Sequence, residues 1–147
     1  MPKPVTPMVG CDSFITNEKK EVLLIKRRDS GLWALPGGFH DLGETPAKCA
    51  VRECFEETGY EITIAHLLGV FSSNNYKYVN YQWKENEITH ILFIGKITGG
   101  EPKVSDETLQ IGWFSEKNLP TLFDGHEARI KVGFSFLNDS SRPAHFE

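Results

Sequence analysis

The chain has 147 residues, 39% hydrophobic and 24% charged, which suits one globular domain and argues against a disordered segment. Its net charge of -4 argues against a basic surface for the nucleic-acid backbone. No apolar run approaches the length of a transmembrane helix, and the first ten residues lack the apolar core of a signal peptide. We therefore expect a soluble, cytoplasmic protein without a membrane or nucleic-acid partner.

Cysteine and histidine usage indicates neither a disulfide framework nor a zinc site. Cys11, Cys49 and Cys54 are odd in number and show no paired spacing such as CxxC. The five histidines form no zinc-ligand pattern. This usage favours a reducing, intracellular compartment.

The first part of the chain predicts an extended lead-in, two strands and a loop. Residues 1–8 are rich in proline and predict the lead-in. The segments VGCDSFI and EVLLIKR, separated by the polar TNEKK, predict two strands of a hairpin. The following SGLWALPGGFHDLGE predicts a loop whose Leu-Pro-Gly-Gly run bends sharply and lets another group approach closely.

A helix is predicted after this loop. Thr45 is a good N-cap, Pro46 a favoured first helical residue, and Gly59 the expected C-terminal stop. Residues at helical spacing along one side should dock the helix on the core. They are Ala47, Val51, Cys54, Phe55 and Thr58.

Three glutamates, Glu53, Glu56 and Glu57, lie nearly opposite that stripe. They crowd the negative end of the helix dipole, and like charges at these spacings repel by roughly 0.2–0.5 kcal/mol per pair. Such a cluster of carboxylate oxygens favours a hard divalent cation, above all Mg²⁺, which bridges carboxylates to substrate phosphates. A solvated acidic face is the alternative for three acidic residues taken alone.

Further strands follow the helix. EITIAHLLGVF and THILFIGKI predict two strands, and LQIGWFS predicts a shorter one. The polar segment between the first two carries aromatic side chains that could stack a base, with ordinary cross-strand pairs of a hairpin as the alternative. They are Tyr76, Tyr78, Tyr81 and Trp83.

The C-terminal part predicts a helix and a tail. DGHEARIKVGFSFL predicts the helix, with Asp124 as its N-cap and His126 at its start. Residues from about 139 to 147 predict a flexible tail. We therefore expect a single domain, residues 1–147, of the α/β (α+β) class.

The spacing around the glutamates carries a specific signature. From Gly38 the chain runs five residues to Glu44, then seven residues to RECFEETGY at positions 52–60. This closely resembles the signature of the Nudix hydrolases, G-x5-E-x7-R-E-U-x-E-E-x-G-U, where U is a bulky aliphatic residue. Every charged and glycine position matches, while Cys54 and Tyr60 stand at U positions that they can also fill with apolar bulk. The resemblance extends less specifically through LLIKRRDSGLWALPGG and ETLQIGWFSEKNLP.

The resemblance implies a Nudix fold, a mixed β-sheet sandwiched between helices. It also implies Mg²⁺-dependent hydrolysis, with Mn²⁺ as a substitute, of a pyrophosphate bond in a nucleoside diphosphate linked to another moiety. ADP-ribose and dinucleoside polyphosphates are such substrates. By the same resemblance, Glu53 and Glu57 are the principal metal ligands, Glu56 is a third ligand or the base for water, and the carbonyl of Gly37 or Gly38 joins the metal shell.

Other residues receive roles from the same resemblance. Arg52 lies one helical turn from Glu56 and can orient the cluster, with Glu44 as its partner. An acidic residue from a later loop is the other candidate base, and here Glu107 is favoured over Asp106. For both, an exposed surface turn is the alternative.

Substrate contacts are expected at Arg27, where relatives often place a phosphate contact, although a solvated strand end is an equal alternative. Tyr76 and Tyr78 fall where a tyrosine in this family hints at dinucleoside polyphosphates. Two other functions stay open: a nucleotide-sanitising (d)NTP pyrophosphohydrolase and a non-catalytic, nucleotide-sensing Nudix domain. The sensor should lose signature carboxylates, which this chain keeps. A homodimer is compatible with the resemblance.

Overall fold

The computed structural model describes residues 1–81 and 86–147, and its strands form two sheets. One sheet has the order β4 (Gly37–Phe39), β1 (Met8–Phe14), β6 (Ile88–Gly100) and β5 (Tyr60–Ser72). The other has the order β3 (Trp33–Ala34), β2 (Val22–Arg27) and β7 (Thr108–Phe114). The first sheet is mixed, since β1 and β6 run parallel while its other pairs are antiparallel. Trp83 lies outside the described residues.

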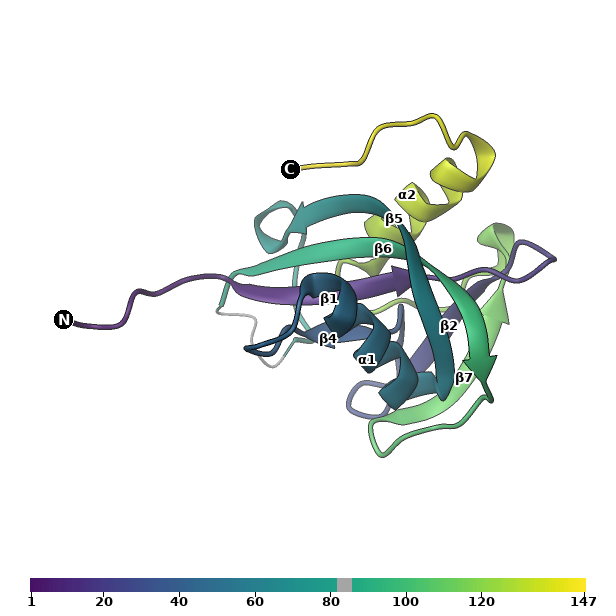
Figure 1. Cartoon of the computed structure of the whole chain (residues 1–147), viewed down its shortest axis with the longest axis horizontal. Helices are drawn as coiled ribbons and strands as arrows, with labels where there is room; N and C mark the ends of the chain where they lie inside the picture. Colours follow the sequence, from purple (N-terminus) through teal and green to yellow (C-terminus); the bar gives the residue numbers. More distant parts are fainter. Residues whose placement is uncertain (82–85) are drawn as a thin grey trace.

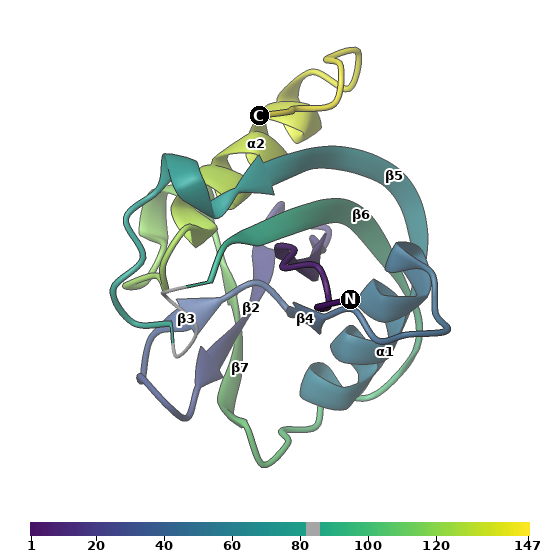
Figure 2. The same ribbon diagram turned by 90° about the vertical axis from the view of Figure 1, so that its left-hand side faces the viewer.

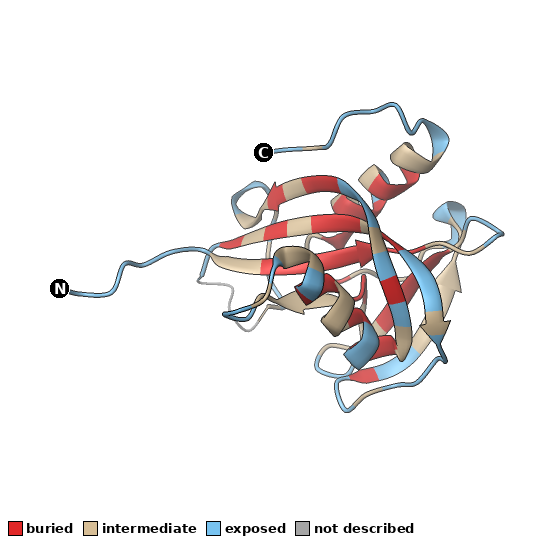
Figure 3. Cartoon of the chain, in the orientation of Figure 1, coloured by how far each residue is buried: buried red, intermediate tan, exposed pale blue. Residues whose placement is uncertain are grey.

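Two helices flank the sheets, α1 (Pro46–Thr58) and α2 (His126–Asn138). Figures 1 and 2 show them on opposite sides of the strands, with α1 beside β1 and β4 and α2 beside β5. Short 3-10 turns cover Ser73–Asn75 and Glu116–Asn118. Figure 3 shows that burial concentrates in the strands between the helices. The predicted Nudix arrangement of a mixed sheet between helices is confirmed.

The predicted hairpin of the first two strands is wrong. β1 and β2 belong to different sheets, and their connection pairs just beside the turn, through the antiparallel Thr16–Val22 bridge. The hydrogen bonds there run from the Leu23 N–H to the Ile15 carbonyl at 2.9 Å and from the Asn17 N–H to the Glu21 carbonyl at 3.1 Å. Both strands carry continuous rather than alternating burial. Each therefore lies inside its own sheet, with β1 between β4 and β6 and β2 between β3 and β7.

Helix α1 begins and ends as predicted. The Thr45 hydroxyl accepts a hydrogen bond from the Lys48 N–H at 3.2 Å. Gly59 adopts the left-handed conformation, with φ of 78°, and its N–H donates to the Phe55 carbonyl. A Cβ on Gly59 would also meet the Glu101 carbonyl oxygen at 2.1 Å, so only glycine fits there.

The predicted docking face of α1 is partly wrong. Phe55 is 53% exposed, whereas Glu57 is only 8% exposed. The buried positions are Cys49, Ala50, Cys54, Glu57 and Thr58. The helix is therefore turned so that Glu57, on the carboxylate side, faces inward and the Phe55 ring faces solvent.

The start of α2 also differs from expectation. Its N-cap is Gly125, without a side-chain capping bond, and not Asp124. The Asp124 carboxylate instead accepts backbone N–H bonds from Val79 at 2.7 Å and Tyr81 at 3.3 Å. A carboxylate next to several free main-chain donors in a loop satisfies them in the same way that it would satisfy a helix end.

Both ends of the chain lie outside the two layers. Residues 1–7 are exposed and precede β1, as expected for the lead-in. The segment expected to be a flexible tail instead folds back on β5. The main-chain N–H of His145 donates to the Leu68 carbonyl at 2.8 Å, and the His145 carbonyl accepts from the Val70 N–H at 2.9 Å.

All three cysteines are buried and free. Within the described residues, neither helix has the length and apolar character needed to cross a membrane.

Candidate active site

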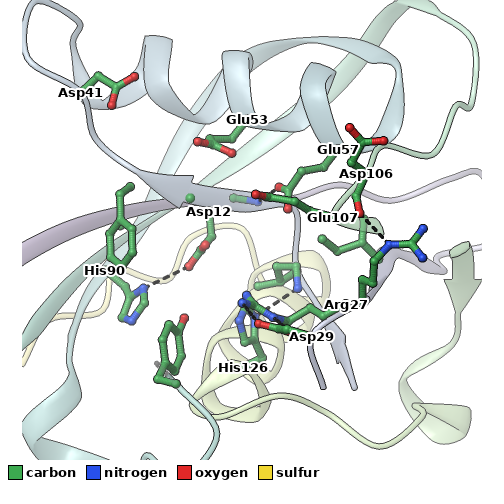
Figure 4. A pocket seen from close by; sticks show the side chains of 18 residues that line it. Asp12, Arg27, Asp29, Asp41, Glu53, Glu57, His90, Asp106, Glu107 and His126 are labelled. Carbon is green, nitrogen blue, oxygen red and sulfur yellow. Dashed lines mark hydrogen bonds and ion pairs between the residues drawn. The ribbon is translucent and has the colours of Figure 1, made fainter. Parts of the chain in front are cut away.

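A cleft of about 610 Å³ opens where the two sheets, the carboxylate side of α1 and the start of α2 meet. Figure 4 shows the side chains that line it. Its acidic end carries carboxylates of α1 and of two loops: Asp41, Glu53, Glu57, Asp106 and Glu107. Across the cleft lies what we call the histidine end, lined by Asp12, Arg27, Tyr81, His90 and His126.

Glu57 is the most buried carboxylate at the acidic end. Its Oε1 accepts a hydrogen bond from the Gly37 N–H at 2.7 Å. Burial raises the pKa of Glu57 well above its ordinary value, and the Gly37 N–H opposes this only in part. The charge of Arg27, which is already paired with Asp29, also opposes the shift only in part, so burial of this carboxylate is not fully compensated.

Glu53 stands one turn earlier on α1 and faces the same cleft. Burial raises the pKa of Glu53, although Arg52 opposes the shift. Its side chain lies directly over Gly38, where an added Cβ would meet the Glu53 carboxyl carbon at 2.4 Å. The glycine predicted to permit a close approach therefore permits the approach of the Glu53 carboxylate.

The register of β4 distinguishes the two glycine carbonyls. Ser13 donates to the Pro36 carbonyl and His40 to the Val9 carbonyl, so every second residue of β4 faces β1. Gly38, paired with Cys11, belongs to that set. Gly37 belongs to the other set, and its carbonyl points away from β1 at the free edge of the sheet, on the side of α1.

Arg52 fixes the carboxylates in place, as the resemblance implied. It forms a two-pronged contact with Glu44, Nε to Oε2 at 3.0 Å and Nη2 to Oε1 at 2.9 Å. Its Nη1 reaches Glu53 Oε1 at 2.9 Å and Glu56 Oε2 at 3.2 Å. The hydrogen bond from Arg52 lowers the pKa of Glu44 to about 2.

Glu56 differs from its two neighbours. Its side chain is 54% exposed, lies outside the cleft lining and pairs only with Arg52 within the described residues. Glu107 and Asp106, in the loop before β7, both line the cleft, and Glu107 is near enough to Glu53 to add to its raised pKa.

Arg27, at the end of β2, lines the cleft as expected of a substrate contact. It is paired with Asp29 through two hydrogen bonds, at 3.0 and 2.8 Å. Its guanidinium also lies over the Phe123 ring, 4.0 Å from the centroid. The pKa of Arg27 is lowered by burial, but the pairing with Asp29 outweighs this and raises it overall.

Of the tyrosines, Tyr81 lines the cleft, whereas Tyr76 and Tyr78 lie behind it. Tyr78 stacks on Tyr81 with ring centroids 4.9 Å apart, and its hydroxyl lies 2.8 Å from His90 Nε2. The Tyr76 hydroxyl hydrogen-bonds to Glu147. Tyr78 therefore supports the wall that Tyr81 forms, whereas Tyr76 is joined to the C-terminal segment and packs on the core.

Sequence reasoning missed a buried ion-pair network at the histidine end. Arg129 of α2 binds Asp12 of β1 and lies 3.0 Å from His90 Nδ1 of β6. Burial alone would raise the pKa of Asp12, but Arg129 and His90 lower it well below the ordinary range. A charged residue inside the apolar strand segment VGCDSFI was the only hint in the sequence.

The acidic end has donors suited to a divalent cation. Within residues 1–81 and 86–147, no three His, Cys, Asp or Glu side chains converge into a preassembled metal site. Mg²⁺, however, binds through one or two carboxylates together with waters and substrate phosphates. The buried and only partly compensated Glu57, the adjacent Glu53 and the outward Gly37 carbonyl fit that mode of binding.

A family model described as the NUDIX domain matches residues 6–133. The chain belongs to this family. It is 39% identical over 128 residues to an ADP-ribose pyrophosphatase of Methanocaldococcus jannaschii, covering 85% of this chain and 72% of that relative. It is 38% identical over 112 residues to a putative 8-oxo-dGTP diphosphatase of Bacillus subtilis, covering 76% and 68%.

Solved structures agree with this Nudix assignment. The crystal structure of an ADP-ribose pyrophosphatase from Streptococcus suis superposes with a TM-score of 0.74 at 26% identity, covering 97% of both chains. A UDP-X diphosphatase gives a TM-score of 0.85 at 24% identity, which supports the fold alone. The predicted resemblance is confirmed, and the protein is a Nudix hydrolase.

Proposed function

We propose that this Nudix hydrolase cleaves the pyrophosphate bond of a nucleoside diphosphate linked to a further group, with ADP-ribose as the leading substrate. The observation that carries the proposal is the buried Glu57 carboxylate, which faces the same cleft as Glu53 and whose burial the Gly37 N–H and Arg27 offset only in part. A carboxylate buried with incomplete compensation has a raised pKa and an unfavourable charged form. A divalent cation and a diphosphate together would remove that imbalance.

Glu53, Glu57 and the Gly37 carbonyl would hold Mg²⁺ or Mn²⁺ in this proposal. When bound, the cation supplies charge neutralisation for the diphosphate and Lewis-acid activation. Glu56, the third candidate ligand, balances Arg52 instead, because its carboxylate lies on the outer side of that guanidinium. Gly38 serves by leaving space for Glu53.

The chain's own residues would then position and accept the proton of the attacking water. Arg52, clamped by Glu44, holds Glu53 in one orientation toward the cleft. Glu107, on the facing loop, accepts the proton as water adds to one phosphorus. The bond from that phosphorus to the bridging oxygen breaks, and the oxygen leaves with the second phosphate.

ADP-ribose is favoured because two relatives are named as an ADP-ribose pyrophosphatase and a putative one. The first of them is 39% identical over 128 residues of this chain. The relative named as a putative 8-oxo-dGTP diphosphatase keeps (d)NTP hydrolysis as the second candidate. A purely nucleotide-sensing role is disfavoured by the retained Glu53, Glu56 and Glu57. Assembly as a homodimer stays a prediction, which light scattering would check.

A panel of nucleotides with Mg²⁺ tests the proposal. ADP-ribose, diadenosine polyphosphates and 8-oxo-dGTP should be compared, and we expect ADP-ribose to yield AMP and ribose 5-phosphate with the highest kcat/KM. Glu57→Gln should lower kcat at least about 10³-fold, since it removes an anionic ligand from the reacting centre. Glu116→Gln, at an exposed glutamate far from the cleft, is the matched control. Unchanged kcat in Glu57→Gln would contradict the proposed site, and no turnover of any nucleotide would contradict the function.

A further inference from the structure

His126, the first residue of α2, lies at the histidine end and is almost fully buried in the wall of the cleft. Its side chain lines the cleft, yet the residue is only 2% exposed. Its Nδ1 accepts a hydrogen bond from the main-chain N–H of Leu35 at 3.1 Å, as Figure 4 shows. The ring is therefore fixed in position by the backbone on the far side of the wall.

That contact determines which ring nitrogen carries the proton. An imidazole nitrogen that accepts from an N–H must be unprotonated, so in the neutral ring Nε2 is the donor. Burial, with a further contribution from Arg129, lowers the pKa of His126 well below its ordinary value, which keeps the ring neutral. Within residues 1–81 and 86–147, no hydrogen bond joins Nε2 to another group, and Nε2 is not among the unpaired side-chain atoms sealed from solvent, so it opens on the cleft. A donor that is held in place and opens on a cleft is available to a ligand.

The surroundings indicate what that ligand contributes. The cleft beside His126 is apolar and aromatic, lined by Ile25, Leu35 and Tyr81. Tyr81 packs against Phe123, with ring centroids 4.6 Å apart. Apolar and aromatic walls with a few fixed polar groups, here His126 beside the charged residues of the histidine end, are typical of a site for a flat heterocycle with a polar edge.

A phosphate fits this end poorly because both nearby arginines already have carboxylate partners. Arg129 binds Asp12, and Arg27 binds Asp29 at 2.8 Å. Figure 4 shows His90 and His126 across the cleft from Glu53 and Glu57. A diphosphate at the acidic end would thus place the attached nucleoside, not a second phosphate, toward His126.

We propose that His126 is a specificity-determining residue whose Nε2–H donates to a ring nitrogen or carbonyl oxygen of the substrate's nucleobase. The inference rests on the proposed function, since it assumes that the diphosphate occupies the acidic end. It deepens that function by assigning the base, rather than the linked group, to the histidine end.

Binding of non-hydrolysable ligands tests this without turnover. Affinities for α,β-methylene ADP-ribose and its 1-deaza, 3-deaza and 7-deaza adenine analogues should be measured by calorimetry with Mg²⁺. In each deaza analogue one ring nitrogen, an acceptor, is replaced by C–H. We expect the wild type to bind one analogue about tenfold more weakly, the value of one neutral hydrogen bond.

His126→Asn keeps an oxygen near Leu35 but removes the Nε2–H. This variant should bind the parent ligand about tenfold more weakly than the wild type does. Its affinity for the one analogue that the wild type binds weakly should equal its affinity for the parent ligand. His66→Asn, at an exposed histidine outside the cleft, is the matched control and should behave as the wild type. The pattern of KM should follow the affinities, while kcat at saturation stays within a factor of about 2.

Three outcomes would overturn the inference. The first is equal affinity of the wild type for all four ligands, and the second is unchanged affinity of His126→Asn for the parent ligand. The third is a loss of affinity in His126→Asn that multiplies with the loss caused by the sensitive analogue, as independent effects would. If His126→Asn fails to fold, His126→Gln and the wild-type analogue series provide the same decision. Failure of the proposed function is distinguishable, because it shows as absence of hydrolysis in the nucleotide panel whatever the binding pattern.

Discussion

The two ends of the cleft are built in different ways. At the acidic end, Arg52 and the carboxylates that it holds come from one continuous stretch of chain, because helical spacing and a short loop bring Glu44 and Glu53 to it. Only Asp106 and Glu107 of the acidic end come from elsewhere, the loop before β7. At the histidine end, Asp12, His90 and Arg129 come from β1, β6 and α2 and meet only in the folded protein. The charge balance differs as well: the acidic end carries excess negative charge, whereas the histidine end is neutralised internally.

Because of this difference, the two ends should contribute differently to the stability of the protein without a ligand. A carboxylate such as Glu57, whose burial is only partly compensated, should destabilise the metal-free protein, and in the proposed function it gains a cation and a substrate. The Asp12–Arg129 pair is satisfied without a ligand and should stabilise the fold relative to either partner alone. Variants at the two ends should therefore change stability in opposite directions.

Asp12→Asn should have the largest effect on stability. It leaves Arg129 buried with its positive charge unpaired, which should lower the free energy of unfolding by about 3–5 kcal/mol in urea denaturation at neutral pH. Because the pKa of Asp12 in the fold is lower than usual, the carboxylate's contribution is present above the ordinary pKa and is lost as the pH falls toward the lower one. Wild type and variant should therefore converge in acid.

The double variant Asp12→Asn/Arg129→Met is the control for this prediction. Removing both charges should recover much of the stability that Asp12→Asn loses, since no buried charge is then left unpaired. Equal instability of the single and double variants would show that packing, not the charge pair, dominates at this end.

Glu57→Gln should change the free energy of unfolding in the opposite direction. In metal-free protein at neutral pH it should raise the free energy of unfolding by about 1–3 kcal/mol, since it removes a desolvated charge while keeping an oxygen for the Gly37 N–H. Added Mg²⁺ should raise the melting temperature of the wild type but not of Glu57→Gln.

Glu56→Gln is the matched control, because Glu56 is half-exposed and adjacent in sequence. Its free energy of unfolding should stay within about 0.5 kcal/mol of the wild type. Destabilisation by Glu57→Gln in metal-free protein would contradict the view that the acidic end is built at the expense of stability.

The same contrast explains what the sequence predicted. The fixed spacing of Gly38, Glu44 and Arg52 identified the acidic end, because local geometry alone brings those residues together. The network of Asp12 and Arg129 could not be predicted, since 117 positions separate them and only the sheet order joins them. The orientation of α1 failed for a related reason. Helical periodicity predicted that Phe55 faces the core and that Glu57 faces away from it. Which of the carboxylates is buried in the cleft, however, depends on the position of the neighbouring β4.

A third region, the segment 143–147, packs outside both ends of the cleft, along β5 and against Tyr76. The Glu147 carboxylate accepts from the Ser72 N–H at 2.8 Å and from the Tyr76 hydroxyl. Tyr76 belongs to the segment that continues to Tyr78 and Tyr81. Burial and the contact with Glu147 raise the pKa of Tyr76 to about 12.

Glu147→Gln should have the smallest effect. The free energy of unfolding should fall by less than about 1 kcal/mol, because a glutamine oxygen can still accept one of the two hydrogen bonds. The pKa of Tyr76 should fall toward its ordinary value, visible as one of four tyrosines that ionises at lower pH in an ultraviolet titration. Glu116→Gln should leave that titration unchanged. An identical tyrosine titration in Glu147→Gln would mean that the C-terminal segment does not hold Tyr76 in solution, and that Tyr76 is kept in place by the core residues on which it packs.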